Sequence, residues 1–215
     1  MILSVFTLVS ISSCQKEIST DTTKTSDAFK GHLIPISQIV FTDVNPDSTI
    51  ACIKPCHHEF DLDLNNDGVI DFIFSVIATS ARCATELSSG RNLNYVSVIP
   101  ARESKNMIEC NGNYPARLDS LAIINNTNMS VASAKILRRC ESCFGSGSYF
   151  WGDWDNNEYK YLGLKLIKST NTYYGWVRLS VTANGLGSKL TIRDYAYNNI
   201  PNQPIQAGQY TVQTD

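Results

Sequence analysis

The chain has 215 residues, of which 43% are hydrophobic and 18% charged, with 18 Lys and Arg against 20 Asp and Glu. This composition argues against a disordered chain and against a coiled coil. The formal net charge of -2 argues against a nucleic-acid partner, which would require a basic face to neutralise phosphates. A chain of this length can bury one substantial core, so we expect a single globular domain.

The first predicted element is the apolar run 2–11, which is about half as long as a membrane-spanning helix requires. Its length is typical of the hydrophobic part of a secretory signal peptide. The run ends in Ile11-Ser12-Ser13-Cys14, which resembles the lipobox of bacterial lipoproteins. The resemblance implies a signal peptide at residues 1–13 and a lipid on Cys14. The alternative is cleavage elsewhere, with Cys14 left as a plain thiol.

Residues 14–31 are rich in Ser, Thr, Asp and Lys, and such a segment cannot bury enough apolar surface to fold. We interpret it as a flexible tether to a single β-sandwich domain at residues 32–215. The tripeptide Gln15-Lys16-Glu17 resembles the export signal of Bacteroidetes surface lipoproteins. The resemblance implies an outer-membrane, cell-surface protein whose membrane contact is the lipid anchor.

The rest of the chain reads as all-β. Short runs of β-branched and aromatic residues alternate with clusters of Asn, Asp, Gly and Pro, which predicts an antiparallel β-sandwich or jelly roll, stapled by disulfides. Residues 130–138 are compatible with a short helix or a strand. The predicted strands are 33–41, 69–79, 93–100, 118–124, 161–168, 173–182, 190–197 and 205–212.

The sharpest local motif lies within residues 61–72, where oxygen-bearing side chains alternate around a glycine. Alternation lets every second side chain of a loop turn inward, and glycine permits a sharp bend. The predicted Ca²⁺ ligands are Asp63, Asn65, Asp67, the Val69 carbonyl and Asp71. Phe74 stands where an EF-hand carries its bidentate Glu, so we expect weak affinity, roughly 10⁻⁴ to 10⁻³ M. The alternative is an Asn-Asp-Gly hairpin turn with solvated carboxylates.

Seven cysteines are an odd number, and a lipid on Cys14 leaves an even one. In an exported protein the others are expected to form disulfides whose pairing the sequence does not give. These cysteines are Cys52, Cys56, Cys83, Cys110, Cys140 and Cys143. One alternative is a zinc site that combines Cys52, Cys56, His57 or His58 with Cys140 and Cys143. Another is a c-type haem attached through Cys52 and Cys56 followed by His57, at a rare spacing.

The C-terminal third has the clearest strand pattern. Alternation predicts a hairpin of 161–167 and 173–181 that places Leu162, Leu164, Leu166, Val177, Leu179 and Val181 on one face. Segments 161–166, 174–179, 195–197 and 201–208 resemble a group of secreted bacterial proteins of unknown function with Tyr-Gly-Trp-Val-Arg and Tyr-Ala-Tyr strands. The resemblance covers roughly residues 161–215. It implies an extracellular β-rich domain and supplies no catalytic residues.

The opposite face and a neighbouring loop carry the candidate ligand-binding residues. They are Trp151, Trp154, Tyr174, Trp176 and Arg178, with Tyr161 and Lys165 on the same face. Aromatic rings flanked by polar groups suit a sugar ring or a surface protein. The alternative, which we favour, is that these aromatic residues fill the sandwich interior or lie under a loop, because Trp and Tyr are highly buried on average.

The sequence offers little to an enzyme. It contains three histidines and no nucleophile elbow, phosphate-binding glycine loop or His-Glu-x-x-His motif. We therefore predict a structural or adhesive, glycan-binding protein and not an enzyme. The alternative is a small extracellular glycan hydrolase that uses Asp153 or Glu158 together with Asp194.

Overall fold

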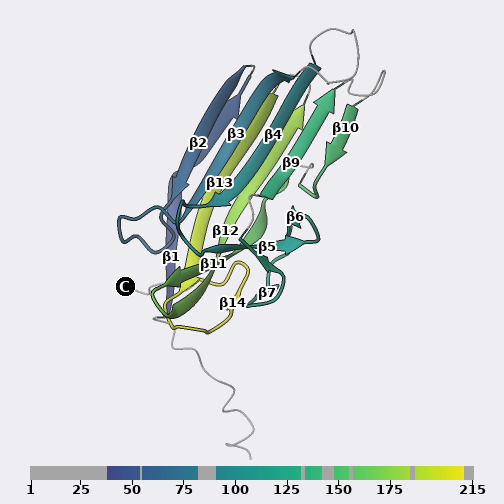
Figure 1. The fold of residues 1–215 in the computed structure, drawn as a ribbon. Coiled ribbons are helices and arrows are strands. Elements are labelled where there is room, and N and C mark those ends of the chain that lie inside the picture. The colour runs from purple at the N-terminus through teal and green to yellow at the C-terminus, as the bar shows by residue number, and fades with distance from the viewer. Residues whose placement is uncertain are drawn as a thin grey trace, which may run out of the picture. The chain divides into compact units, whose positions relative to one another are not determined.

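The computed structural model describes residues 38–53, 55–81, 91–131, 134–141, 148–154, 157–184 and 187–210. They belong to one compact unit that spans Pro35–Asp215, and Figure 1 shows them as antiparallel strands joined by turns and loops. The predicted signal peptide, Cys14, the tether, Cys83 and Cys143 lie outside the described residues, as does the side chain of Cys140. Within these ranges, no helix is long and apolar enough to cross a membrane.

The larger sheet has seven strands in the order β1-β13-β12-β11-β5-β6, with β8 paired to β5. Its centre is an up-and-down meander of three consecutive strands. Their bounds are β11 (Lys160–Lys168), β12 (Asn171–Asn184) and β13 (Gly187–Asn198). The flanking strands are β1 (Ile39–Cys52), β5 (Met107–Asn111), β6 (Tyr114–Pro115) and β8 (Met129–Ser130).

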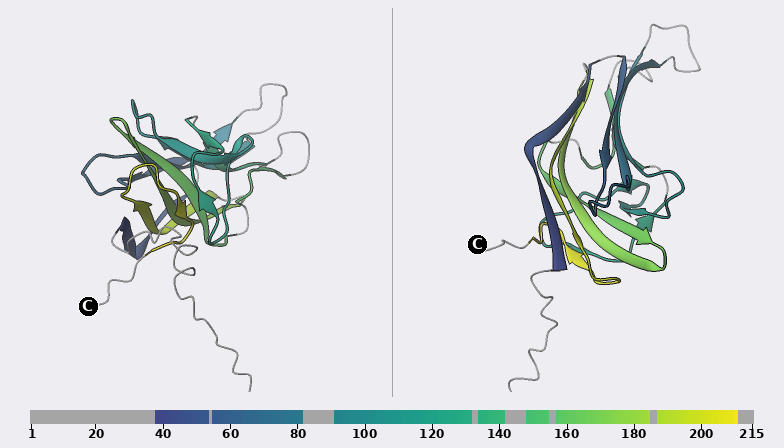
Figure 2. Two further views of the ribbon diagram at one scale, coloured as in Figure 1. Left: turned by 90° about the horizontal axis from the view of Figure 1, so that it is seen from below. Right: turned by 90° about the vertical axis from the view of Figure 1, so that its left-hand side faces the viewer.

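The second sheet has five strands in the order β10-β9-β4-β3-β2. They are β2 (Cys56–Leu62), β3 (Phe72–Ala81), β4 (Arg91–Pro100), β9 (Ala134–Glu141) and β10 (Ser148–Trp151). The two sheets face each other in Figure 2. A two-stranded ribbon of β7 (Ile123–Ile124) and β14 (Ile205–Gln206) completes the described strands.

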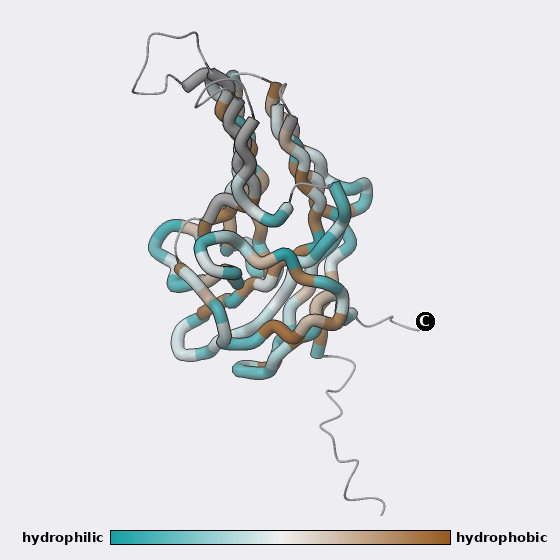
Figure 3. The backbone as a smooth tube through the Cα atoms, turned by 90° about the vertical axis from the view of Figure 1, so that its right-hand side faces the viewer, coloured by the Kyte–Doolittle hydropathy of each residue, from teal (hydrophilic) through white to brown (hydrophobic). Residues whose placement is uncertain are grey.

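The core lies between the two sheets and takes side chains from both. Phe72 and Phe74 of β3 and Val98 of β4 form one buried cluster with Leu162 of β11 and Val177 of β12. In the register of β11 and β12, Leu162 lies opposite Val177, as period-two alternation predicts. Figure 3 shows hydrophobic residues recurring along the strands, whereas the connecting loops are mostly hydrophilic. The predicted antiparallel sandwich is confirmed. Strands that follow one another in the sequence, such as β11, β12 and β13, are neighbours in the same sheet.

A second buried cluster lies on the outer face of the larger sheet. Tyr174, Trp176 and Ala196 pack there against Ile124 of β7 and Ile205 of β14. The short ribbon therefore covers this face as a lid over aromatic side chains. Residues 118–124 and 205–212, predicted as full strands, contribute only these two short strands and one bridge at Leu118 among the described residues.

Three differences from the prediction concern strand length and position. Strand β1 continues to Cys52, past a register shift between Asp43 and Ser48. The residues between them are Val44, Asn45, Pro46 and Asp47, and the last three are of types that sequence patterns assign to a loop. Strands β2, β5, β6 and β10 were not predicted. Residues 134–141 form strand β9, so the segment 130–138, for which a short helix and a strand were both possible, contains a strand.

Candidate metal loop and ligand pocket

The crossover from the larger sheet to the smaller one carries a disulfide. Cys52 ends β1, Cys56 begins β2, and the two are bonded to each other. The bond confirms that these two cysteines are in a disulfide, in a pairing that the sequence left open, and it uses two sulfurs that the zinc and haem alternatives need.

The structure places Cys110 differently from the prediction. It is a free, buried thiol whose sulfur lies 3.6 Å from the Ile108 carbonyl oxygen, so the predicted disulfide is wrong for this residue. Alternation along β5 directs Ile108 and Cys110 into the core, where both are buried. Burial, with a smaller contribution from Glu109, raises the pKa of the thiol. The alternating pattern of residues 107–111 was the available signal that this cysteine fills the core.

The acidic loop, residues 63–71, connects β2 to β3 and is wound around its first carboxylate. Asp63 accepts hydrogen bonds from the backbone N–H of Asp67 at 3.2 Å and of Gly68 at 2.6 Å. Gly68 has a φ of 85°, which only glycine adopts readily. The predicted role of this glycine in the bend is therefore seen in the structure.

Two further carboxylates of the loop face one ammonium group. Lys168, at the end of β11, donates a hydrogen bond to Asp67, and its Nζ lies 3.8 Å from Oδ1 of Asp71. Asp71 is only 2% exposed, and its Oδ2 accepts the backbone N–H of Leu64 at 2.9 Å. The Lys168 hydrogen bond lowers the pKa of Asp67, whereas burial raises the pKa of Asp71. The single positive charge of Lys168 thus partly neutralises two of the predicted metal ligands, Asp67 and Asp71.

The remaining predicted ligands differ in their contacts. The amide nitrogen of Asn65 donates to Asp67 at 3.2 Å, while its Oδ1 is buried without a hydrogen-bond partner. Val69 is exposed and donates its backbone N–H to Asp67. In the part of the chain that the structure describes, no group of three or more His, Cys, Asp or Glu side chains forms a ready metal cluster. The oxygen atoms of the loop nevertheless fit a hard cation such as Ca²⁺, because Asn65 Oδ1 lacks a donor.

The loop is held against the larger sheet by residues far away in sequence. Asn66 donates to Thr42 Oγ1 of β1 and accepts from the Tyr195 hydroxyl of β13, both at 3.1 Å. Asn106 donates to the Asp71 carbonyl at 3.2 Å. The loop therefore ties the smaller sheet to both β1 and β13. Sequence reasoning missed Asn66, because its partners have no local signature.

The predicted exposed aromatic face is mostly buried. Trp176 is 1% exposed under the β7–β14 lid and donates to the Gln209 carbonyl at 3.1 Å. Tyr174 belongs to the same cluster, whereas Trp154 lies in the core between the sheets and donates to the Pro115 carbonyl. The ligand-face prediction is therefore wrong for Tyr174 and Trp154, for which the alternative that they fill the interior or lie under a loop holds. Trp176 is buried as well, but it lines a pocket on this face. Trp151, which is half-buried, ends β10 in the other sheet.

Arg178 does reach a ligand-sized cavity. This aromatic pocket, about 420 Å³ in volume, lies on the outer face of the larger sheet beside the lid. Arg178 binds Asp194 with two parallel hydrogen bonds, and its Cζ lies 5.8 Å from the ring centroid of Tyr161. The hydrogen bonds to Asp194 raise the pKa of Arg178. The pocket therefore contains a fixed pair of planar charged groups next to an aromatic ring.

Two aromatic residues that the sequence did not single out complete this pocket. The rings of Phe41 and Tyr210 lie 5.2 Å apart, and Tyr210 is 56% exposed. Exposed Asp43 and Arg193 lie at the rim. Phe41 belongs to a predicted strand and Tyr210 to a predicted C-terminal strand, but only the fold brings the two ends of the domain together.

The acidic residues of the hydrolase alternative are not assembled into one pair. Asp194 lies in the aromatic pocket, where Arg178 holds it. Asp153 lines a different pocket, and Glu158 pairs with Arg117 at 2.6 Å.

No protein-family model matches the chain, and no curated protein or solved structure matches it either. The fold and the two sites described above therefore carry the functional argument.

Proposed function

We propose that the protein is a lipid-anchored cell-surface β-sandwich that binds a glycan in the aromatic pocket and takes up Ca²⁺ as a structural ion in the acidic loop. The observation that carries the proposal is the exposed Tyr210 ring beside the fixed Arg178–Asp194 pair. A sugar ring has an apolar face that packs on an aromatic ring and hydroxyl edges that need paired donors and acceptors. The pocket offers both within one cavity of about 420 Å³.

The same geometry favours binding over hydrolysis. A hydrolase needs two carboxyl groups that are both available to the substrate. Asp43 lies opposite Asp194 in the register of β1 and β13, but only Asp43 is exposed. Asp194 already accepts two hydrogen bonds from Arg178, which occupy both of its carboxylate oxygens. The guanidinium group has five N–H donors, so its two bonds to Asp194 leave others for Tyr161 and a ligand hydroxyl.

A glycan array tests the proposal with Tyr210→Ala. The Tyr210 ring is exposed, so its removal should leave the fold intact and lower retention of the bound glycan about tenfold. Tyr114→Ala, on strand β6 and outside the aromatic pocket, is the matched control and should keep wild-type retention. Equal retention by the Tyr210 and Tyr114 variants would contradict the glycan proposal.

The calcium part is supported by Asn65 Oδ1, which lacks a partner, and by the carboxylates of Asp67 and Asp71, which share one cation. Binding of a dication would require the Lys168 ammonium to move aside. At 10 mM Ca²⁺ and a Kd of about 1 mM, binding should stabilise the fold by about 1.4 kcal/mol. Melting temperatures in Ca²⁺ and in EGTA measure this. A melting temperature that is unchanged under both reducing and non-reducing conditions would remove the calcium claim.

Lipid attachment at Cys14 has its own test. Cys14→Ala should move the protein from the membrane fraction to the soluble fraction of the producing cell, because the acyl chains supply the membrane affinity. External protease should remove the wild-type domain from intact cells if the protein is exposed on the surface. Retention of Cys14→Ala in the membrane would contradict the anchor.

A further inference from the structure

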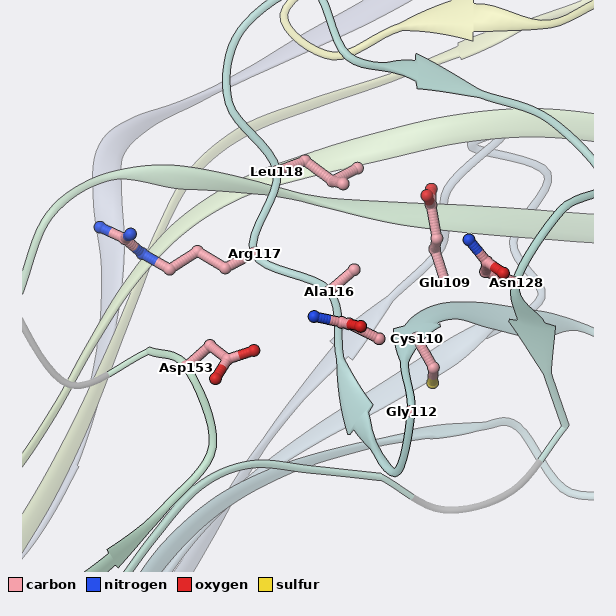
Figure 4. A pocket seen from close by; sticks show the side chains of 9 residues that line it. Glu109, Cys110, Gly112, Ala116, Arg117, Leu118, Asn128 and Asp153 are labelled. Carbon is pink, nitrogen blue, oxygen red and sulfur yellow. The ribbon is translucent and has the colours of Figure 1, made fainter.

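A second pocket, separate from the aromatic pocket and the acidic loop, lies at the edge of the larger sheet. It has a volume of about 390 Å³ and is lined by residues of β5, the 116–118 segment and a neighbouring loop. Figure 4 shows that Glu109 and Cys110 point to opposite sides of β5. We call this cavity the carboxyl pocket.

Glu109 is an unusual residue for such a place. It is 7% exposed, and its Oε2 has no hydrogen-bond partner. The side chain packs directly on β11, where a Cβ at Gly163 would lie 2.2 Å from that oxygen. The sheet thus leaves room for the carboxyl group but gives Oε2 no donor, although a buried carboxylate oxygen without a donor is costly.

The cations near Glu109 are turned to other partners. Arg117 lines the pocket but extends away from Glu109 in Figure 4 and pairs with Glu158 at 2.6 Å. Lys165, two residues along β11 from Gly163, donates to Asn126. Asp153, also in the lining, is exposed and adds negative charge. Neighbouring Cys110 directs its thiol into the core.

We propose that the carboxyl pocket binds a small ligand through a protonated primary amine, with Glu109 as the carboxylate that recognises it. The amine supplies the positive charge and the hydrogen-bond donors that the carboxyl group of Glu109 lacks on the side of the pocket that this residue lines. The amides of Asn111 and Asn128 and the carboxylate of Asp153 provide further acceptors in the lining. A cavity of this volume accommodates an amino sugar or the side chain of a lysine residue.

The protonation state of Glu109 links this site to pH. Burial raises the pKa of Glu109 to about 7. An ammonium ligand binds the ionised form, so binding should lower this pKa and release protons below pH 7. The ionised fraction rises from about one tenth at pH 6 to about nine tenths at pH 8, and affinity should rise about tenfold.

The experiment uses NMR titration of the folded domain with two amines and their neutral counterparts. Nα-acetyl-lysine amide is compared with its 6-hydroxynorleucine analogue, whose terminal hydroxyl replaces the amine, and glucosamine is compared with glucose. The lysine derivative keeps its charge between pH 6 and pH 8 and therefore serves for the pH series. Shifts at residues of the carboxyl pocket distinguish this site from the aromatic pocket.

Glu109→Gln keeps the shape of the side chain and removes its charge. It should weaken binding of the amines at least tenfold at pH 8 and abolish the pH dependence. Glu59→Gln, an exposed change on β2, is the matched control and should leave both unchanged. Glu109→Asp, which withdraws the carboxyl group from Gly163, should also weaken binding.

Three results would overturn the proposal. They are equal binding of amine and hydroxyl analogues at the pocket, wild-type affinity in folded Glu109→Gln, and shifts with neither amine at the carboxyl pocket. Binding of only one amine distinguishes a peptide side chain from an amino sugar and supports the site. The outcome is independent of Tyr210→Ala, so the two proposals can fail separately.

Discussion

The two faces of the larger sheet are built from the same strands but differ in the kinds of side chain that they bury. The face toward the smaller sheet is aliphatic, with Leu162 and Leu164 of β11 and Leu179 of β12 fully buried. The outer face buries charged groups instead, Glu109 and Asp194 among them. Aliphatic packing stabilises a fold without recognising a ligand, whereas buried charge costs stability and is informative about binding. Both candidate pockets include residues of the outer face.

The largest expected effect tests the inner face. Phe74→Ala should lower the free energy of unfolding by about 3–5 kcal/mol, because Phe74 is fully buried between the sheets and the change leaves a cavity. Urea denaturation measures this loss. A loss below about 1 kcal/mol would mean that the two sheets do not share a tight core.

The next effect concerns the outer face, where replacing a buried residue should raise the stability of the fold at pH 8 instead of lowering it. Because burial raises the pKa of Glu109 from 4.5 to about 7, the folded state holds a proton that the unfolded state has lost in this interval. Stability should therefore fall as pH rises from about 4.5 to about 7, by about 3 kcal/mol in total. Glu109→Gln should remove this slope and be more stable than the wild type at pH 8. Urea denaturation of the wild type and of Glu109→Gln at pH 5 and at pH 8 measures this change. An equal loss of stability in the two proteins between these pH values would contradict the raised pKa.

A smaller effect is expected at the acidic loop. Lys168→Gln removes the ammonium that contacts Asp67 and lies near Asp71, so the protein without Ca²⁺ should lose about 0.5–1 kcal/mol. The same change removes the competitor of a metal ion, so the increase in melting temperature on addition of Ca²⁺ should be larger than in the wild type. Lys160→Gln, which breaks the exposed pair with Asp119 elsewhere, is the control. If Ca²⁺ raises the melting temperature of Lys168→Gln no more than that of the wild type, Lys168 and the metal ion do not compete for the same carboxylates.

The smallest effect on stability is expected from Tyr210→Ala. The exposed ring contacts Phe41 at the rim of the aromatic pocket, so its loss should change the free energy of unfolding by less than about 1 kcal/mol. The ligand affinity should fall at the same time. A large loss of stability would mean that Tyr210 belongs to the packed part of the outer face.

Local patterns predicted those parts of the fold that depend on local sequence. Alternation in residues 161–181 predicted the hairpin and its buried face, and Gly68 predicted the bend of the acidic loop. The length of strand β1 was underestimated because a bulge that contains Asn45, Pro46 and Asp47 interrupts its pattern. The sequence could not show that two short strands cover Trp176, because the β7–β14 ribbon is a non-local pairing.

The acidic loop and the carboxyl pocket show the same difference between local and long-range features. The acidic loop was recognisable because its oxygen atoms are spaced within nine residues, whereas Lys168, about a hundred residues away, left no sign in the motif. Glu109 was invisible as a candidate, because its environment is created by Gly163 on another strand and by residues 116–118. Burial of a charge is a property of the assembled fold, so its pKa is visible only in three dimensions.

The thiol of Cys110 gives the edge of the larger sheet a built-in reporter. Its thiol is buried and only 9% of the residue is exposed, so an alkylating reagent should reach it mainly when that edge opens. The labelling rate of this peptide, followed by mass spectrometry, therefore measures the frequency of local opening. Because Glu109 is the preceding residue on the same strand, an occupied carboxyl pocket should slow that rate. The labelling rate of Cys110 thus reports whether the carboxyl pocket, which this residue also lines, is occupied.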